Sequence, residues 1–263
     1  MLDIERARHV ITLTKGIHFT DGAFTDARER LSLLTVASRV RPIALFLDFE
    51  KAGLQRLKDL LINIGFVAFV GKLRSSGRTS SDDSYTPEVV AVLKRYLSED
   101  DHRALWVCNS SEDRQRIRNR ATDFGALLGY PECCVHWDQQ AHDEFVAAIV
   151  RASHGDAHEV ERHLKQNIQV GVTVPHEDNV PRTERLYPFV MHIACDSCLG
   201  TGDSPSSLLN QQYQSLVRDV DALLHDVLLQ LGEKAWRIHT ATSQDEKDIL
   251  FAEAESIYLR ALA

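Results

Sequence analysis

The sequence predicts an α/β protein, with a short, mostly parallel sheet in its N-terminal half and a mainly helical C-terminal half. The first observation is a pair of short apolar runs, residues 42–47 and 66–70, each of the length of a buried strand. The second is the segment between them, residues 48–64, where leucines recur at helical spacing. A strand, a helix and a strand in this order predict a βαβ unit, whose two strands are parallel neighbours joined by a right-handed crossover.

The next elements complete the N-terminal half. A serine-rich stretch, residues 71–86, is too polar to pack and is expected to be a loop. Proline at position 87 opens a helix that continues to residue 97. Residues 103–108 form a third apolar run and therefore a third strand. A helix with acidic residues in its first turn follows from 111 to about 128, and the sequence Gly129-Tyr-Pro131 ends it.

The C-terminal half is expected to be mainly helical. Helical patterns cover residues 132–151 and 157–167, and a long amphipathic pattern runs from Ser204 to Leu231. Residues 169–188 contain three prolines and are expected to be a loop, with a short strand at 187–193. A last helix is expected at 245–262. The division predicted is therefore residues 1–128 as the α/β part and 129–263 as the helical part, or one integrated domain if the cysteine motifs join the halves.

Composition narrows the class of protein. The chain has 263 residues, 44% hydrophobic and 26% charged, which is ordinary for a globular protein. A formal charge of -8 and a pI near 5.8 argue against a nucleic-acid-binding protein. The first residues lack the apolar core of a signal peptide, and no apolar run is long enough for a membrane span. The expected setting is the cytoplasm, with a small molecule as the partner.

Four of the five cysteines occur as two tight pairs, Cys133-Cys134 and Cys195-x-x-Cys198. In a reducing compartment, clustered thiols favour metal binding or redox chemistry over structural disulfides. The first pair follows Gly129 and Pro131, which are suited to end one helix and begin the next. Thiols in a first helical turn lie near unpaired N–H groups, so we expect a lowered pKa and thiolate character there.

The second pair has the two-residue spacing that recurs in zinc, iron–sulfur and dithiol sites, because the intervening turn directs both sulfurs at one point. His192 precedes this pair, and His136 follows the first pair. Either imidazole would complete the ligand shell or hydrogen-bond to it. Asp203, in the glycine- and serine-rich segment after Cys198, is a candidate non-thiolate neighbour, although Ser204 and Pro205 are also a good helix start. We therefore predict metal ligation by Cys133, Cys134, Cys195 and Cys198, with His136, His192 and Asp203 around them.

The sequence LLGYPECC, followed by the distant HIACDSC, resembles an uncharacterised prokaryotic family with a GYP-x-CC signature, known as domain of unknown function 483. The resemblance covers roughly residues 40–230. It implies that the two cysteine motifs belong to one site, and it implies no reaction.

The sequence is compatible with more than one cofactor and more than one function. Adjacent cysteines on a helix point in different directions, which favours an iron–sulfur cluster over a single zinc ion. The expected function is an iron–sulfur or zinc enzyme that handles sulfur or redox chemistry on a small molecule. The alternatives are a non-catalytic module with a structural zinc and a metal-free dithiol protein. The catalytic residue is undetermined, with Cys133, Cys134 and the strand-end Cys108 as candidates.

Overall fold

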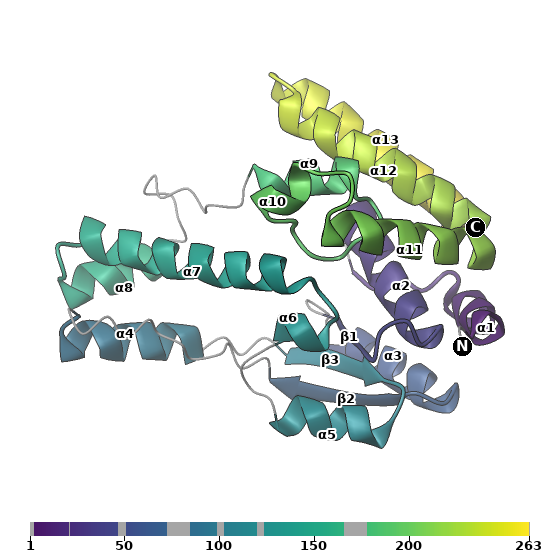
Figure 1. Cartoon of the computed structure of the whole chain (residues 1–263), viewed down its shortest axis with the longest axis horizontal. Helices are drawn as coiled ribbons and strands as arrows, with labels where there is room; N and C mark the ends of the chain where they lie inside the picture. The colour runs from purple at the N-terminus through teal and green to yellow at the C-terminus, as the bar shows by residue number, and fades with distance from the viewer. Residues whose placement is uncertain are drawn as a thin grey trace.

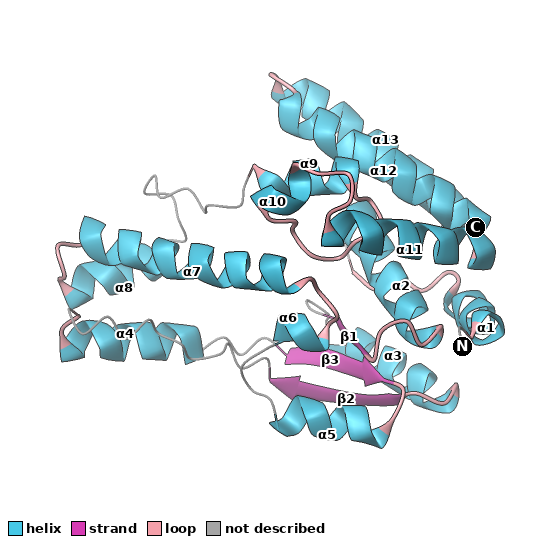
Figure 2. Ribbon diagram, in the orientation of Figure 1, coloured by secondary structure: helices cyan, strands magenta, loops and turns pink. Residues whose placement is uncertain are grey.

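The computed structural model describes residues 3–20, 22–46, 51–72, 85–98, 103–119, 124–165 and 178–262. In this part of the chain, helices dominate and one small sheet lies toward the N-terminal half (Figures 1 and 2). Up to the sheet's last strand the elements are α1 (Ile4–Thr14), α2 (Ala23–Ala37), β1 (Ile43–Phe46), α3 (Lys51–Asn63), β2 (Val67–Lys72), α4 (Pro87–Ser98) and β3 (Arg103–Cys108). The later helices are α5 (Ser111–Asn119), α6 (Phe124–Leu127), α7 (Glu132–Ala152), α8 (Ala157–Lys165), α9 (Asn179–Leu186), α10 (Asp196–Leu199), α11 (Pro205–Val220), α12 (Ala222–Thr240) and α13 (Gln244–Leu262).

The sheet is antiparallel, so the prediction of a mostly parallel sheet is wrong. Its strand order is β1-β3-β2, and β3 pairs antiparallel with both neighbours. Cys108, at the end of β3, is opposite Ile43 on one side and Val67 on the other. The strands β1 and β2 point the same way, as a βαβ unit requires, but β3 lies between them. Apolar runs predict strands, but they do not encode which strands become neighbours. The predicted α/β class is therefore wrong. The described part of the protein is mainly helical, with a small antiparallel sheet.

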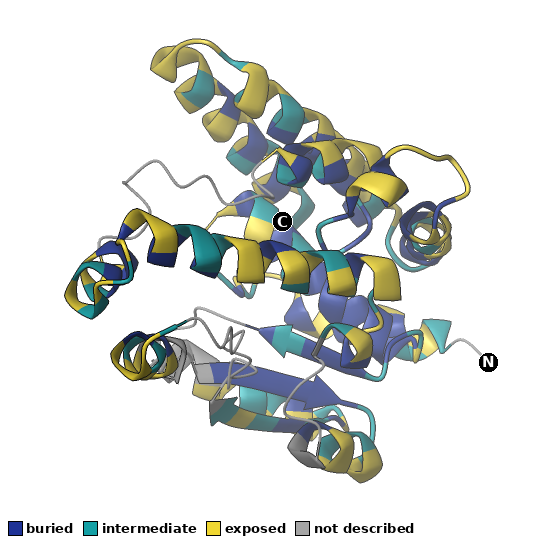
Figure 3. Cartoon of the chain, turned by 60° about the vertical axis from the view of Figure 1, so that its left-hand side comes forward, coloured by how far each residue is buried: buried dark blue, intermediate teal, exposed yellow. Residues whose placement is uncertain are grey.

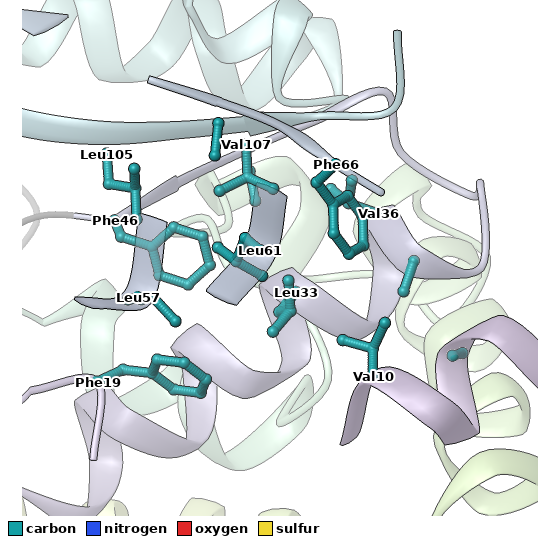
Figure 4. Packing of buried hydrophobic residues seen from close by; sticks show 14 residues of the cluster. Val10, Phe19, Leu33, Val36, Phe46, Leu57, Leu61, Phe66, Leu105 and Val107 are labelled. Carbon is teal, nitrogen blue, oxygen red and sulfur yellow. The ribbon is translucent and has the colours of Figure 1, made fainter. Parts of the chain in front are cut away.

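The two faces of the sheet are covered by different helices, as the period-2 alternation of its side chains requires. On one face, Phe46, Leu105 and Val107 pack against α3 and α2, where Leu61 and Leu33 are fully buried (Figure 4). On the other face, Trp106 and Cys108 pack against residues of α5 and α6. The sheet is therefore an internal layer, and Figure 3 shows its strands mostly buried while the helices carry exposed residues outside.

A second core joins the two ends of the chain. Leu31 and Leu34 of α2 pack with Tyr213 of α11, Leu228 of α12 and Tyr258 of α13. Helix α1 also lies against α2 and α11. The proposed boundary near Gly129 stays a prediction, but the packing of α2 crosses it.

A third group of helices forms an extension beside the sheet. Helices α4, α7 and α8 share a core of their own, with Leu93, Ile149 and Val160 buried in it. Figure 1 shows these three helices on the left, with α7 running from this extension back toward α6 and α10. Helix α7 therefore connects the extension to the centre of the molecule.

Three local expectations in the C-terminal half differ from the structure. Residues 179–186, within the expected loop, form α9, since its Pro181 lies in the first turn where no intrahelical N–H bond is lost. Residues 187–193 form turns and extended chain, without a strand. The long helix expected from Ser204 is broken at Asp221, whose side chain accepts a hydrogen bond from the Leu224 N–H at 3.0 Å and so begins α12.

Most of the remaining expected elements are found, but the helix expected from 111 to about 128 appears as α5 and α6, with residues 120–123 outside the described residues. The strand 103–108 and the helix from position 87 appear as β3 and α4. Most of the serine-rich loop 71–86 lies outside the described residues. Among those described, no helix combines the length and apolarity that a membrane span requires.

Candidate metal centre

The first cysteine pair is positioned by a tight turn between α6 and α7. Gly129 adopts a φ of +73°, the left-handed conformation predicted for the end of the preceding helix. Pro131 then caps α7, which begins at Glu132. Gly125 fixes the approach of the two helices, because a Cβ there would lie 2.5 Å from the Val135 side chain. As a result, Cys133 and the buried Cys134 lie in the first turn of α7.

The second pair lies on a short turn that α9 holds in place. Cys195 caps the one-turn helix α10, and its carbonyl accepts a hydrogen bond from the Cys198 N–H at 2.9 Å. Upstream, the Ala194 N–H donates to the Thr183 hydroxyl at 3.0 Å. Asn179 donates from its side-chain amide to the Asp196 carboxylate at 3.0 Å. Two polar side chains of α9 therefore fix the turn that carries both sulfurs.

The four thiols converge, as the sequence predicted. The Sγ–Sγ distances are 3.5 Å from Cys133 to Cys198, 3.7 Å from Cys134 to Cys195 and 3.7 Å from Cys134 to Cys198. The neighbouring sulfurs of Cys133 and Cys134 are 4.0 Å apart. All four lie within 4.8 Å of one another, and none is in a disulfide. Four cysteines in this arrangement could bind a metal ion.

These spacings can be compared with those of a single tetrahedral ion. A zinc–sulfur bond is about 2.3 Å long, and the edge of a tetrahedron is roughly 1.63 times its centre-to-corner distance, which gives sulfurs about 3.8 Å apart. The shortest contacts among the four thiols, 3.5 to 4.0 Å, bracket this value. The donor set is also one that zinc prefers. The residues therefore fit a single thiolate-bound ion.

Burial and charge at the four sulfurs are unequal. Cys133 is exposed, whereas Cys134, Cys195 and Cys198 are at most 3% exposed. Burial, followed by the neighbouring Cys198 thiol, raises the pKa of Cys133 to about 11, and burial also raises the pKa of Cys134. Burial alone would raise the pKa of Cys198 too, but hydrogen bonds from Ser206 and the other thiols lower it to about 7. The lowered pKa expected for Cys133 and Cys134 at a helix start is thus not found, because burial raises the pKa of both thiols.

A polar chain extends from the sulfurs into the protein. The Cys195 N–H donates to the Cys134 sulfur at 3.4 Å, and the Ser206 hydroxyl lies 3.3 Å from the same sulfur. The His192 Nε2 atom lies 2.8 Å from the Ser206 hydroxyl. Burial, with the nearby Arg41 and Arg28, lowers the pKa of His192 to about 4, so its imidazole is neutral. His192 therefore reaches the thiols through Ser206.

The other predicted neighbours lie elsewhere. His136 is exposed on α7, and Asp203 is exposed in the turn before α11. Neither belongs to the described group of close metal-ligand side chains, which holds the four cysteines alone. Cys108 is also separate from that group. It is completely buried, its thiol donates to the carbonyls of Val67 and Ser110, and burial raises its pKa to about 11.

Several residues of the site were not singled out from the sequence. Ser206 contacts Cys134, Tyr187 donates its hydroxyl to the Cys198 carbonyl at 2.7 Å, and α9 supplies Asn179 and Thr183. The only sequence signal for Ser206 is its place in the glycine- and serine-rich segment that follows Cys198. The Ser204 cap and Pro205 were correctly identified as the start of α11.

Comparison with models of known protein families, with curated proteins and with solved structures finds no match. The resemblance to the GYP-x-CC family therefore stays a prediction.

Proposed function

We propose that the protein is a zinc-binding protein in which Cys133, Cys134, Cys195 and Cys198 hold one zinc ion as a structural link. The observation that carries the proposal is the mutual distance of the four sulfurs, with neighbouring pairs 3.5 to 4.0 Å apart. Four thiolates complete a tetrahedral shell and leave no position for a substrate, which is the arrangement typical of structural zinc.

The link would join two parts of the molecule that share little other packing. Cys133 and Cys134 begin α7, which packs mainly along α6 and α8. Cys195 and Cys198 belong to the layer of α9, α10 and α11. Between these parts lies a small core in which Cys134, Cys195 and Cys198 are themselves members, with Tyr187 and Val190. An ion bound by both pairs would therefore fix α7 to the C-terminal helices.

An iron–sulfur cluster is the alternative that the sequence favoured. In a four-iron cluster each thiolate binds a different iron, so the four sulfurs lie farther apart than around a single ion. The sequence favours a cluster because the side chains of two adjacent cysteines on a helix point in different directions. In the first turn of α7 their sulfurs are only 4.0 Å apart, which supports a shared ion instead.

A metal-free dithiol function is the second candidate, and the exposure of Cys133 favours it. The Cys133 sulfur lies 3.5 Å from that of the buried Cys198. Oxidation of this pair would form one S–S bond and release two protons and two electrons, which a small-molecule disulfide would accept by becoming two thiols. This candidate would make the protein a redox or sulfur-transfer enzyme acting on a small molecule.

X-ray absorption at the zinc edge tests the proposal against both alternatives. We expect a shell of four sulfurs at about 2.3 Å in the purified protein. The Cys198→Ala variant should lose the metal, whereas the matched Cys108→Ala variant should keep it, because Cys108 is buried away from the group. A metal-free protein with a Cys133–Cys198 disulfide, or an iron edge with bridging sulfides, would overturn the zinc proposal.

A further inference from the structure

A cavity of about 390 Å³ lies beside the candidate metal centre. It lies between the α6–α7 turn, one side of α7 and the irregular residues 191–193. Its wall is mainly apolar and includes one sulfur-bearing residue of the cysteine group, Cys134. Its lining also includes Leu128, Tyr130, Asp138, Gln139, Met191 and His192.

One unsatisfied polar atom belongs to the wall of this cavity, and a second lies directly behind the wall. In the described part of the chain, three buried side-chain nitrogens lack a hydrogen-bond partner: Arg41 Nη2, His192 Nδ1 and Arg114 Nε. His192 lines the cavity and is only 8% exposed. Its Nε2 faces the Ser206 hydroxyl, and in the tautomer in which that hydroxyl donates to Nε2, the unpartnered Nδ1 carries the proton and can donate it to an anion. Buried polar atoms are normally paired, and an unpaired one in a cavity wall indicates a missing ligand.

Arg41 supports the same wall from behind. Its Nε donates to the Leu128 carbonyl at 2.6 Å, and its guanidinium lies 5.3 Å from the centre of the Tyr130 ring. Its Nη1 contacts the Met191 sulfur at 2.9 Å. All three of these partners line the cavity. Arg41 is therefore in direct contact with the cavity wall on the side of His192.

The charge of Arg41 has no counter-ion in the described structure. The side chain is 2% exposed, and no described carboxylate forms an ion pair with it. A buried charge without a partner is strongly unfavourable. Among the described residues that line the cavity, Asp138 is the only acidic one, and it is exposed. An anion in the cavity would offset the charge that the protein leaves uncompensated.

We propose that this cavity binds a small organic acid, with its apolar body against Leu128, Tyr130 and Met191 and its carboxylate on the side of Arg41 and His192. The site goes beyond the structural zinc, and benzoate binding is measured separately from metal content. It shares only Cys134 with the cysteine group.

Benzoate, with the uncharged benzamide as its isosteric control, tests the proposal by ligand-observed NMR titration of the full-length protein. We expect benzoate to bind at least tenfold more tightly than benzamide. Arg41→Met should weaken benzoate at least tenfold without changing benzamide. Asp138→Asn, at an exposed position, should tighten benzoate severalfold because it removes the negative charge among the described lining residues.

Two further variants keep the test specific. Gln139→Trp should fill the cavity and abolish benzoate binding, whereas Arg8→Gln, on the distant helix α1, should leave it unchanged. Asp138→Asn provides the decisive result if Arg41→Met fails to fold. Three results would overturn the proposal. The first is equal binding of benzoate and benzamide, and the second is an unchanged benzoate affinity in Asp138→Asn. The third is no binding of either compound up to roughly 10 mM, a dissociation constant that corresponds to about 3 kcal/mol.

Discussion

The two ends of helix α7 are held by different means. At its C-terminal end, Val146, Ile149 and Val150 pack against α4 and α8 in a dry apolar core. At its N-terminal end, Cys134 packs in a core of different composition, in which three cysteines and an alanine accompany only a few larger side chains. The first end follows the usual rule that buried apolar area holds helices together. The second end buries fewer large aliphatic side chains and brings together four thiols.

Different interactions therefore stabilise the two ends of α7. Where apolar packing is extensive, as in the α4–α7–α8 extension, no bound ion is required. Where α7 meets the C-terminal helices, we propose that a metal ion supplies the missing attachment. Variants that alter one end of α7 at a time separate these two kinds of stabilisation.

The largest effect is expected from removing the metal. A tightly bound ion present at about a thousand times its dissociation constant stabilises the folded state by about 4 kcal/mol. For a chain of this size that amounts to roughly 10 °C in the unfolding midpoint. Chelation by EDTA, or the Cys198→Ala variant, should lower the midpoint by that amount in calorimetry. Cys108→Ala serves as the control and should keep its sensitivity to the chelator. Identical melting with and without EDTA would contradict the role of the metal.

The next effect concerns the apolar end of α7. Leu93 of α4 is fully buried in that core, so Leu93→Ala should destabilise the protein by about 3 kcal/mol through a lost side chain and a residual cavity. Because this end is distant from the cysteines, the additional loss on chelation should be the same as in the unaltered protein. Urea unfolding with and without EDTA measures both quantities. A chelator effect that disappears in Leu93→Ala would show that the two ends are not independent.

A smaller effect is expected from Ser206, which joins His192 to the Cys134 sulfur. Ser206→Ala should weaken zinc binding about tenfold, or about 1.4 kcal/mol, because groups that orient a ligand typically contribute at least that much. Competition with a coloured chelator gives the affinity. The neighbouring Ser207→Ala is the matched control, since its hydroxyl bonds to the Gly202 carbonyl. Equal affinities in the two variants would remove Ser206 from the site.

The smallest effect separates Cys108 from the other thiols. Burial raises the pKa of Cys108 from 9.0 to about 11, so its folded-state thiol stays protonated while the unfolded thiol ionises. This contribution to the free energy of unfolding is complete below pH 9 and is lost as the pH rises toward 11. The loss amounts to about 1 kcal/mol at pH 10. Cys108→Ala should therefore lose less stability than the unaltered protein between pH 8 and pH 10.

Alkylation provides a second readout of the same contrast. At pH 8 iodoacetamide should leave Cys108 unmodified and should label the exposed Cys133 only after chelation. Peptide mass spectrometry identifies the modified residue. Rapid labelling of Cys108 in the folded protein would be inconsistent with its burial.

The sequence predicted the parts of the site that depend on local chemistry. Gly129 and Pro131 specify a turn and a helix start by their backbone preferences, and the Cys195-x-x-Cys198 spacing specifies a turn that gathers two sulfurs. The two flanking histidines looked equivalent in sequence. They are not, because a residue two positions after Cys134 on a helix points to nearly the opposite side, which leaves His136 exposed.

The features that depend on distant contacts were not predictable in the same way. The pairing of β3 between β1 and β2 has no signature in the apolar runs of the three strands. Ser206 acquires its role only because α11 brings it to within 3.3 Å of Cys134. The prolines of residues 169–188 suggested a loop, although Pro181 is compatible with the first turn of α9.

Metal analysis of the purified protein is the most direct test of a structural zinc held by the four cysteines. We predict one zinc per chain, a colourless solution and loss of the metal in Cys198→Ala but not in Cys108→Ala. A protein that contains no metal, or one with iron, sulfide and an absorption band near roughly 400 nm, would contradict a structural zinc at the start of α7.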